Sequence, residues 1–262
     1  MTEIHGDWIL LRGLTREARH WGEFPSGLAA SLGTRVHCLD LPGNGRLNRL
    51  RSPSTVEGLA DWCHGELRHL GLARPCGVLA MSLGAMVTVA WAERHAEDID
   101  RAVLVNTSFR PFSFPWQRLR PAIYPRLLRL LALPASDRLI EQSVMEMTSR
   151  HPADHAECLA QWQEWRHENP VSRRNALAQL LAAARYRAPL RSPLKRMLLL
   201  ASAADELVSV ECSRRLASRW ALELREHPEA GHDLPLDPPA WVLHQVAKWS
   251  GAEGRELADS TA

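Results

Sequence analysis

The chain has 262 residues, of which 45% are hydrophobic and 24% charged, and this is ordinary for a globular protein with one α/β domain and room for an insertion. A formal net charge of +2 gives no bulk electrostatic support for nucleic-acid binding. Five scattered cysteines without a Cys-x-x-Cys pair indicate no disulfide framework, and the histidines are scattered along the chain, so we expect no metal site.

The first residues show no basic start followed by an apolar run, so we expect no signal peptide. No apolar stretch approaches the roughly 20 residues that span a bilayer. We therefore expect a cytoplasmic protein with no membrane partner, no nucleic-acid partner and no metal. The sequence gives no indication of the oligomeric state.

Short apolar runs alternate with helical patterns in the first part of the chain. Strands are expected at 8–11, 36–41, 77–81 and 102–105, and helices within 15–32, from a Ser54–Glu57 capping box to about residue 70, and over 83–91. The strands are apolar throughout rather than alternating. This pattern is typical of a parallel sheet that is covered by helices on both faces.

The pattern changes after residue 107, where no convincing strand occurs for some eighty residues. Helices separated by prolines are expected at 127–133, 139–147, 155–166 and 173–186. Strands then return at 196–200 and 221–226, with helices over 210–220 and 239–249. We expect an α/β core made of residues 1–107 and 190–250, an inserted all-helical segment at 108–189, and a polar tail at 251–262.

Ser82 separates a buried strand from a helix, with small residues two positions before and after it, Ala80 and Gly84. A serine at such a sharp turn is lifted above the sheet edge, and bulky neighbours would clash with the backbone that passes close by. The helix that follows directs its free N–H groups and positive dipole end toward a reacting carbonyl. These residues form a nucleophile elbow pattern, Ala replacing the more usual first glycine.

A serine nucleophile needs a base and an acid that orients the base. Asp205 follows the strand at 196–200, and His232 follows the strand at 221–226, so both leave the same sheet edge as Ser82. Glu206 is the neighbouring carboxylate, but its spacing from the strand favours Asp205. Asn106 closes the strand before the insertion, and its amide cannot serve as the acid.

At this point the sequence resembles the α/β-hydrolase superfamily along nearly the whole chain. The motifs that carry the resemblance are, in order, Leu11–Leu14, Asp40–Gly45, Ala80–Gly84, Asp205 and Gly231–His232. The resemblance implies an α/β-hydrolase fold with a mostly parallel sheet flanked by helices, the segment 108–189 being its helical cap. It also implies that Ser82 is the nucleophile, His232 the base and Asp205 the acid. The backbone N–H groups of Leu14 and Leu83 would then form the oxyanion hole.

Three further residues are candidates for substrate binding. Arg12 stands where the family usually has histidine, and it either pairs with Glu17 or Asp40 to shape the loop or meets an anionic substrate. Trp116 and Trp162 either line an acyl pocket or hold cap helices on the core. Arginine is frequent in the cap, which fits either solvated helix faces or an acidic partner.

We therefore expect a serine hydrolase that cleaves a small-molecule carboxylic ester or thioester without a cofactor. Two alternatives stay open: C–C bond hydrolysis or a menaquinone-pathway-like elimination on the same three residues, and a non-catalytic ligand-binding protein. An acyl carrier protein is a less favoured partner. Fold-level resemblance does not identify the substrate.

Overall fold

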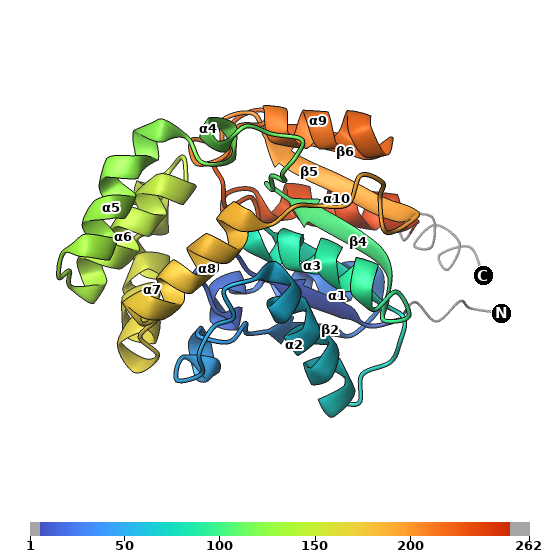
Figure 1. Ribbon diagram of the computed structural model, residues 1–262, viewed down its shortest axis with the longest axis horizontal. Helices are drawn as coiled ribbons and strands as arrows, with labels where there is room; N and C mark the ends of the chain where they lie inside the picture. The colour runs from blue at the N-terminus through green and yellow to red at the C-terminus, as the bar shows by residue number, and fades with distance from the viewer. Residues whose placement is uncertain (1–5, 252–262) are drawn as a thin grey trace.

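The computed structural model describes residues 6–251 and contains one six-stranded sheet (Figure 1). The strands are β1 (Trp8–Leu11), β2 (Val36–Leu39), β3 (Cys76–Met81), β4 (Ile99–Val105), β5 (Arg196–Ser202) and β6 (Glu223–His227). Their order is β2-β1-β3-β4-β5-β6, and every neighbouring pair is parallel. This confirms the expected α/β fold class.

Helices connect the strands and cover the sheet. The α-helices are α1 (Phe24–Leu32), α2 (Val56–His69), α3 (Leu83–Arg94), α4 (Pro115–Arg118), α5 (Tyr124–Ala132), α6 (Asp137–Thr148), α7 (Ala156–Glu168), α8 (Arg173–Arg185), α9 (Glu211–Trp220) and α10 (Pro239–Ser250). Short 3-10 helices lie at Ala18–Trp21, Gly45–Leu47, Pro121–Ile123 and Pro152–His155. No helix in the described residues is both long enough and apolar enough to cross a membrane.

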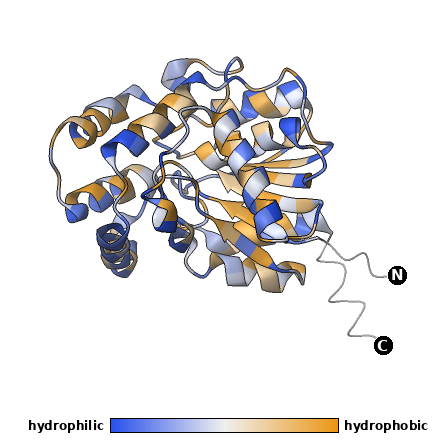
Figure 2. Cartoon of the chain, turned by 60° about the horizontal axis from the view of Figure 1, so that its bottom comes forward, coloured by the Kyte–Doolittle hydropathy of each residue, from blue (hydrophilic) through white to orange (hydrophobic). Residues whose placement is uncertain are grey.

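The two faces of the sheet carry separate apolar clusters. Side chains of α1 and α10 pack with alternate strand residues on one face, and side chains of α2, α3 and α9 pack on the other. Figure 2 shows the apolar strands enclosed by helices of mixed hydropathy. Both faces of the central strands are therefore buried, which explains why those strands are apolar throughout.

Helices α4 to α8 lie between β4 and β5, where the sequence predicts the inserted segment (Figure 1). Helices α5, α6 and α7 extend away from the sheet. Helix α8 runs back toward it, and its Ala182, together with Tyr186 just after its end, joins the apolar cluster of α2 and α3. The last predicted helix of the insertion is therefore also part of the packing of the core.

One local expectation was wrong. Helix α2 is capped by Thr55, whose side chain accepts from the backbone N–H of Gly58, rather than by a Ser54–Glu57 box. The strand expected at 221–226 is β6, which forms one edge of the sheet and is partly exposed. The expected polar tail lies almost wholly outside the described residues.

Candidate active site

The sequence-predicted site residues gather at the carboxyl edge of the sheet. Ser82 follows β3 directly, Asp205 follows β5 and His232 follows β6. Because all six strands are parallel, the segments that leave these strands meet at one edge. The residues predicted to provide the oxyanion hole, Leu14 and Leu83, follow β1 and begin α3 at the same edge.

Ser82 occupies a strained turn between β3 and α3, with φ 53° and ψ −115°. A non-glycine residue in this conformation is rare and indicates a constraint imposed by its surroundings. Space around the turn is small: a Cβ added to Gly84 would lie 2.6 Å from the carbonyl oxygen of Leu11. A Cβ added to Gly13 would lie 3.2 Å from Ser82 Cβ. The loop after β1 therefore packs directly against the serine.

The Asp205 carboxylate holds the His232 imidazole. Asp205 Oδ2 lies 2.7 Å from His232 Nδ1, and both side chains are almost fully buried. Backbone N–H groups of Leu207 and Val208 donate to Asp205 Oδ1 at 2.8 and 2.9 Å. A carboxylate only accepts hydrogen bonds, so Nδ1 carries the proton of neutral His232 and its Nε2 is the basic atom.

Ser82 and His232 line the same large cavity. The structure gives no direct hydrogen bond between the Ser82 hydroxyl and the imidazole of His232. Hydrogen bonds of this kind are commonly long in unliganded enzymes and shorten when substrate binds. Ser82 therefore lies in the same cavity as the His232–Asp205 pair, without a direct hydrogen bond between the serine and the imidazole.

Two backbone N–H groups next to the serine are without a hydrogen-bond acceptor in the described residues. The N–H groups of Leu14 and Leu83 have no acceptor among residues 6–251, and both residues line the cavity. Leu83 is the first residue of α3, where backbone N–H groups are free and the helix dipole favours negative charge. These two N–H groups are available to donate hydrogen bonds to a developing oxyanion.

A side chain from α8 fixes the loop that carries Leu14. Gln179, which is fully buried, accepts from the backbone N–H of Thr15 at 2.9 Å and donates to Asn44 Oδ1 at 2.8 Å. Asn44 in turn donates to the carbonyl oxygen of Arg16 at 2.9 Å. The inserted helices thus set the position of one of the two backbone donors, a role that sequence reasoning missed.

Arg12 pairs with Asp233, the residue that follows His232. Its two terminal nitrogens lie 3.0 and 2.5 Å from the two carboxylate oxygens, and both side chains are buried. The guanidinium also lies over the Trp21 ring, 4.8 Å from its centroid. The expected partners were wrong: Glu17 binds Arg19, and Asp40 accepts from backbone N–H groups. The ion pair joins the loop after β1 to the loop that carries His232.

Asn106 also holds the loop that carries His232. Its Nδ2 donates to the carbonyl oxygens of His232 at 2.7 Å and Gly231 at 3.3 Å, and its Oδ1 accepts from the backbone N–H of Ser202 at 2.8 Å. Asn106 has a positive φ of 43°, which asparagine tolerates better than most residues. An amide that both donates and accepts suits this bridge, and a carboxylate would lose the bonds to the carbonyl oxygens.

Trp162 packs beneath the loop after β1 rather than in the cavity. Its ring lies under the Arg16 guanidinium at 3.9 Å and against His20 at 5.2 Å, and it is 1% exposed. Arg16 also binds the buried Glu141 of α6 at 2.5 Å. Trp116 is 56% exposed and stacks on Phe114. Neither tryptophan lines the cavity, so we do not assign a substrate contact to either of them.

The cavity has a volume of about 950 Å³ and reaches from the sheet edge into the inserted helices. Its floor includes Ser82, His232 and the loop after β1. Most of its wall is apolar and comes from residues between β4 and β5, with arginine side chains among them. This volume and lining are typical of a site for a small organic molecule with a sizeable apolar part.

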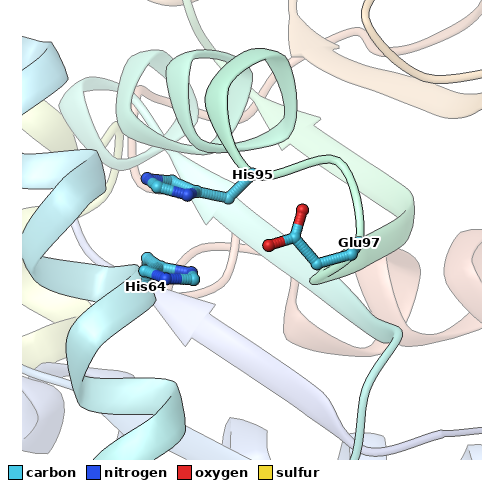
Figure 3. Close-up of side chains that lie close together, drawn as sticks. All are labelled: His64, His95 and Glu97. Atoms are coloured by element: carbon cyan, nitrogen blue, oxygen red, sulfur yellow. The ribbon is translucent and has the colours of Figure 1, made fainter.

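One group of potential metal ligands occurs within the described residues, formed by His64, His95 and Glu97 (Figure 3). It lies at the amino end of β4, away from the edge that holds Ser82. The two imidazole rings stack at 3.8 Å with planes only 8° apart. Nitrogen lone pairs lie in the ring planes, so parallel rings do not converge on one ion. The group therefore belongs to a stacked pair and not to the candidate active site.

The fold and the site geometry together define a hydrolase-like α/β protein, and the sequence agrees. The signature of the alpha/beta hydrolase family matches residues 4–245, so the chain belongs to this family. A homoserine O-acetyltransferase from Halorubrum lacusprofundi is 33% identical over 75 residues, which are 28% of this chain and 17% of that protein. The chain thus matches only a small part of that relative's length.

Solved structures of several α/β-hydrolases have the same fold. The enol-lactonase of Burkholderia xenovorans superposes with a TM-score of 0.75 at 20% identity, covering 94% of this chain and 92% of that one. A thermophilic esterase from Thermogutta terrifontis superposes with a TM-score of 0.71 at 21% identity, covering 93% of this chain and 88% of that one. A meta-cleavage product hydrolase from Pseudomonas fluorescens superposes with a TM-score of 0.74 at 15% identity, covering 94% of this chain and 90% of that one. At these identities the likeness concerns the fold alone.

Proposed function

We propose that this protein is a serine hydrolase that cleaves a carboxylic ester or thioester through an acyl-enzyme on Ser82. The observation that carries the proposal is the buried His232–Asp205 pair beside a serine held at a strained strand-to-helix turn. Ser82 and His232 both line a cavity that is large enough for an organic substrate. A structural serine would need neither the strained turn nor a buried base oriented by a carboxylate.

In the first half of the reaction, Ser82 Oγ attacks the carbonyl carbon of the substrate. Its proton passes to His232 Nε2, and the imidazolium is stabilised by Asp205. The carbonyl oxygen gains the negative charge and accepts from the backbone N–H groups of Leu14 and Leu83. Each such donor contributes roughly 3 kcal/mol in the transition state. The tetrahedral intermediate then collapses, and the leaving alcohol or thiol takes the proton from His232.

In the second half, water replaces the alcohol or thiol. His232 Nε2 accepts a proton from the water as its oxygen attacks the acyl carbon, and the same two N–H groups hold the oxyanion. Collapse of this second intermediate breaks the bond to Ser82 Oγ, which recovers its proton from His232. The products are the free acid and the resting enzyme.

A fluorophosphonate reacts with an activated serine and tests the proposal directly. We expect the wild-type protein to gain one adduct by intact-protein mass spectrometry, and Ser82→Ala to gain none. His232→Ala is expected to slow labelling by at least about 100-fold, because general-base assistance contributes that much. Ser209→Ala, which changes a serine after β5 that does not line the cavity, is the matched control and should label like wild type.

An unlabelled wild-type protein would contradict the proposal and favour a ligand-binding role. Labelling without hydrolysis of any ester or thioester in a chain-length series would retain the activated serine but move the reaction toward C–C bond cleavage or elimination. Turnover of a β-diketone by the same preparation would then identify the alternative.

A further inference from the structure

The apolar part of the cavity is formed by helices that contribute little to the core. Leu127, Leu130 and Leu131 of α5 line the cavity, and no residue of α5 is buried. Ile140 and Val144 of α6 continue the same wall. Apolar side chains that face a cavity rather than a packed neighbour gain most from an apolar ligand. This wall fits an acyl chain of several carbons.

Arginines in the cavity wall divide into two kinds. Arg12, Arg16 and Arg166 each have a carboxylate partner, so their charges are neutralised within the protein. Arg110, Arg118, Arg173 and Arg187 also line the cavity but have no carboxylate within ion-pair distance in the described part of the chain. The second kind leaves an excess of positive charge at a largely apolar site, where an anion would be strongly attracted.

Three of these unneutralised arginines lie together where the chain leaves the sheet and where α8 ends. The backbones of Arg110 and Arg187 form a β-bridge, so the two residues are neighbours. Arg118 donates to the carbonyl oxygens of Ala183, at 2.5 Å, and Ala184, at 3.2 Å. Burial lowers the pKa of Arg118, and the positive charge of Arg110 acts in the same direction. We call Arg110, Arg118 and Arg187 the arginine group.

The arginine group and the apolar wall occupy different parts of the cavity. Figure 1 shows α5 and α6 extending away from the sheet, whereas α4 lies near α9 and α8 runs back toward the sheet. Helix α4 is tied to the segment that follows Asp205, because Ser209 N donates to the carbonyl oxygen of Gln117 at 2.9 Å. A substrate with its carbonyl at Ser82 can therefore extend one arm along the apolar wall and the other toward the arginines.

We propose that the substrate is an ester or thioester of an apolar acyl chain whose leaving group carries a phosphate or carboxylate, and that the arginine group binds this anion. Guanidinium groups bind both anions through paired N–H donors. The acyl chain takes the apolar wall, so the anion belongs to the alcohol or thiol that departs. The inference rests on the proposed hydrolase function and names its substrate class.

Three thioesters with the same octanoyl chain test this assignment. Octanoyl-CoA carries phosphates, S-octanoyl-6-mercaptohexanoate carries a carboxylate, and S-octanoyl-N-acetylcysteamine is neutral. Thiol release gives kcat/KM for each. We expect wild type to prefer at least one of the anionic thioesters to the neutral one by about tenfold or more, and the preference to shrink as salt is added. The better anionic thioester shows whether phosphate or carboxylate is recognised.

The double variant Arg110→Gln/Arg187→Gln should bring the ratio of anionic to neutral kcat/KM close to one. Arg118 is left unchanged in this test because it also caps the carbonyl end of α8. Arg185→Gln is the matched control: Arg185 is an exposed arginine of the same helix that does not line the cavity, so the ratio should stay at the wild-type value.

Equal kcat/KM for neutral and anionic thioesters in wild type would overturn the inference. So would a stronger preference for S-(7-carboxyheptanoyl)-N-acetylcysteamine, whose anion is on the acyl side. In both cases fluorophosphonate labelling of Ser82 shows that the hydrolase proposal still stands. Absence of labelling together with no thiol release from any thioester would contradict the hydrolase proposal, and this inference with it.

Discussion

At the scale of single residues, the pair Arg12–Asp233 shows how the site is held together. A buried ion pair contributes little compared with an apolar pair of the same shape, but removing one partner leaves a buried charge unpaired. Arg12 and Asp233 are both about 2–3% exposed and belong to the two loops that flank Ser82. The pair therefore fixes the position of the loop after β1 relative to the loop that carries His232.

We predict that Arg12→Met lowers the free energy of unfolding by about 3–5 kcal/mol, because Asp233 is left charged without a partner. The double variant Arg12→Met/Asp233→Leu should regain part of this loss, since neither charge remains buried. Urea unfolding followed by circular dichroism measures the double variant and the two single variants, Arg12→Met and Asp233→Leu. If the double variant is as unstable as the sum of the two single variants, the two residues are not coupled and this account of the pair is incorrect.

We expect substitution by alanine to have opposite effects on the free energy of unfolding at two glycines, Gly84 and Gly65. Gly84→Ala places a Cβ 2.6 Å from the Leu11 carbonyl oxygen and 2.7 Å from that of Arg12, so we expect a loss of about 1–3 kcal/mol in unfolding free energy. Gly65 lies within α2 with open space around it, and Gly65→Ala should stabilise by about 0.5–1 kcal/mol. Urea midpoints of the two variants give the signs. A neutral Gly84→Ala would show that the elbow is looser than the structure has it.

At the scale of elements, helix α5 lines the cavity while none of its residues is buried. One side of it lines the cavity, and Leu128 on another side is 64% exposed. Its low burial means that its side chains are free to determine the length of chain that the cavity accepts, with little effect on the stability of the core.

We predict that Leu130→Trp shortens the acyl chain that the cavity accepts, because a larger side chain fills the apolar wall. The kcat/KM for a decanoyl ester should fall by roughly tenfold, a loss typical for removing space for one or two methylene groups, while that for a butyryl ester changes little. Leu128→Trp adds the same side chain to the same helix outside the cavity and serves as the control. Equal losses for both ester lengths would argue against an acyl site beside α5.

The sequence predicted these elements well where the signal is local. Apolar runs and turns located the buried strands β1, β3, β4 and β5, and the positions of Ser82, Asp205 and His232 after parallel strands placed them at one edge of the sheet. The geometry of the elbow also followed from residue size, because small side chains are needed where backbone passes close.

Contacts between distant segments could not be predicted in the same way. Arg12 and Asp233 are separated by 221 positions, and Asn106 lies 126 positions before His232. Their pairing depends on which loops meet at the sheet edge, and this is set by tertiary packing. For the same reason the side chains of Trp116 and Trp162 could not be placed from helical spacing, which does not show against which neighbour a helix packs.

At the scale of the whole molecule, His20 connects the α/β core to the inserted helices. It lies after β1 and packs edge-on against Trp162 and Trp165 of α7. Its Nδ1 accepts from the backbone N–H of Glu17 at 3.0 Å, and its buried Nε2 has no partner. Burial lowers the pKa of His20 well below the ordinary histidine value of 6.5, and the charges of the neighbouring arginines act in the same direction.

This lowered pKa predicts that the protein loses stability as pH falls below about 6.5. The unfolded chain then gains a proton on His20 that the folded protein does not take up, so protonation favours unfolding. Between pH 6.5 and 5.5 the loss of unfolding free energy from this one residue is about 1 kcal/mol.

The variant His20→Asn keeps an acceptor near the position of Nδ1 and does not titrate. Its unfolding free energy should therefore fall by about 1 kcal/mol less than that of wild type over the same pH range. The eleven other histidines are common to both proteins, and their contributions cancel in the difference. Urea unfolding at closely spaced pH values measures the two curves; parallel curves would mean that His20 takes up its proton in the folded state and that the contact between core and inserted helices opens to admit it.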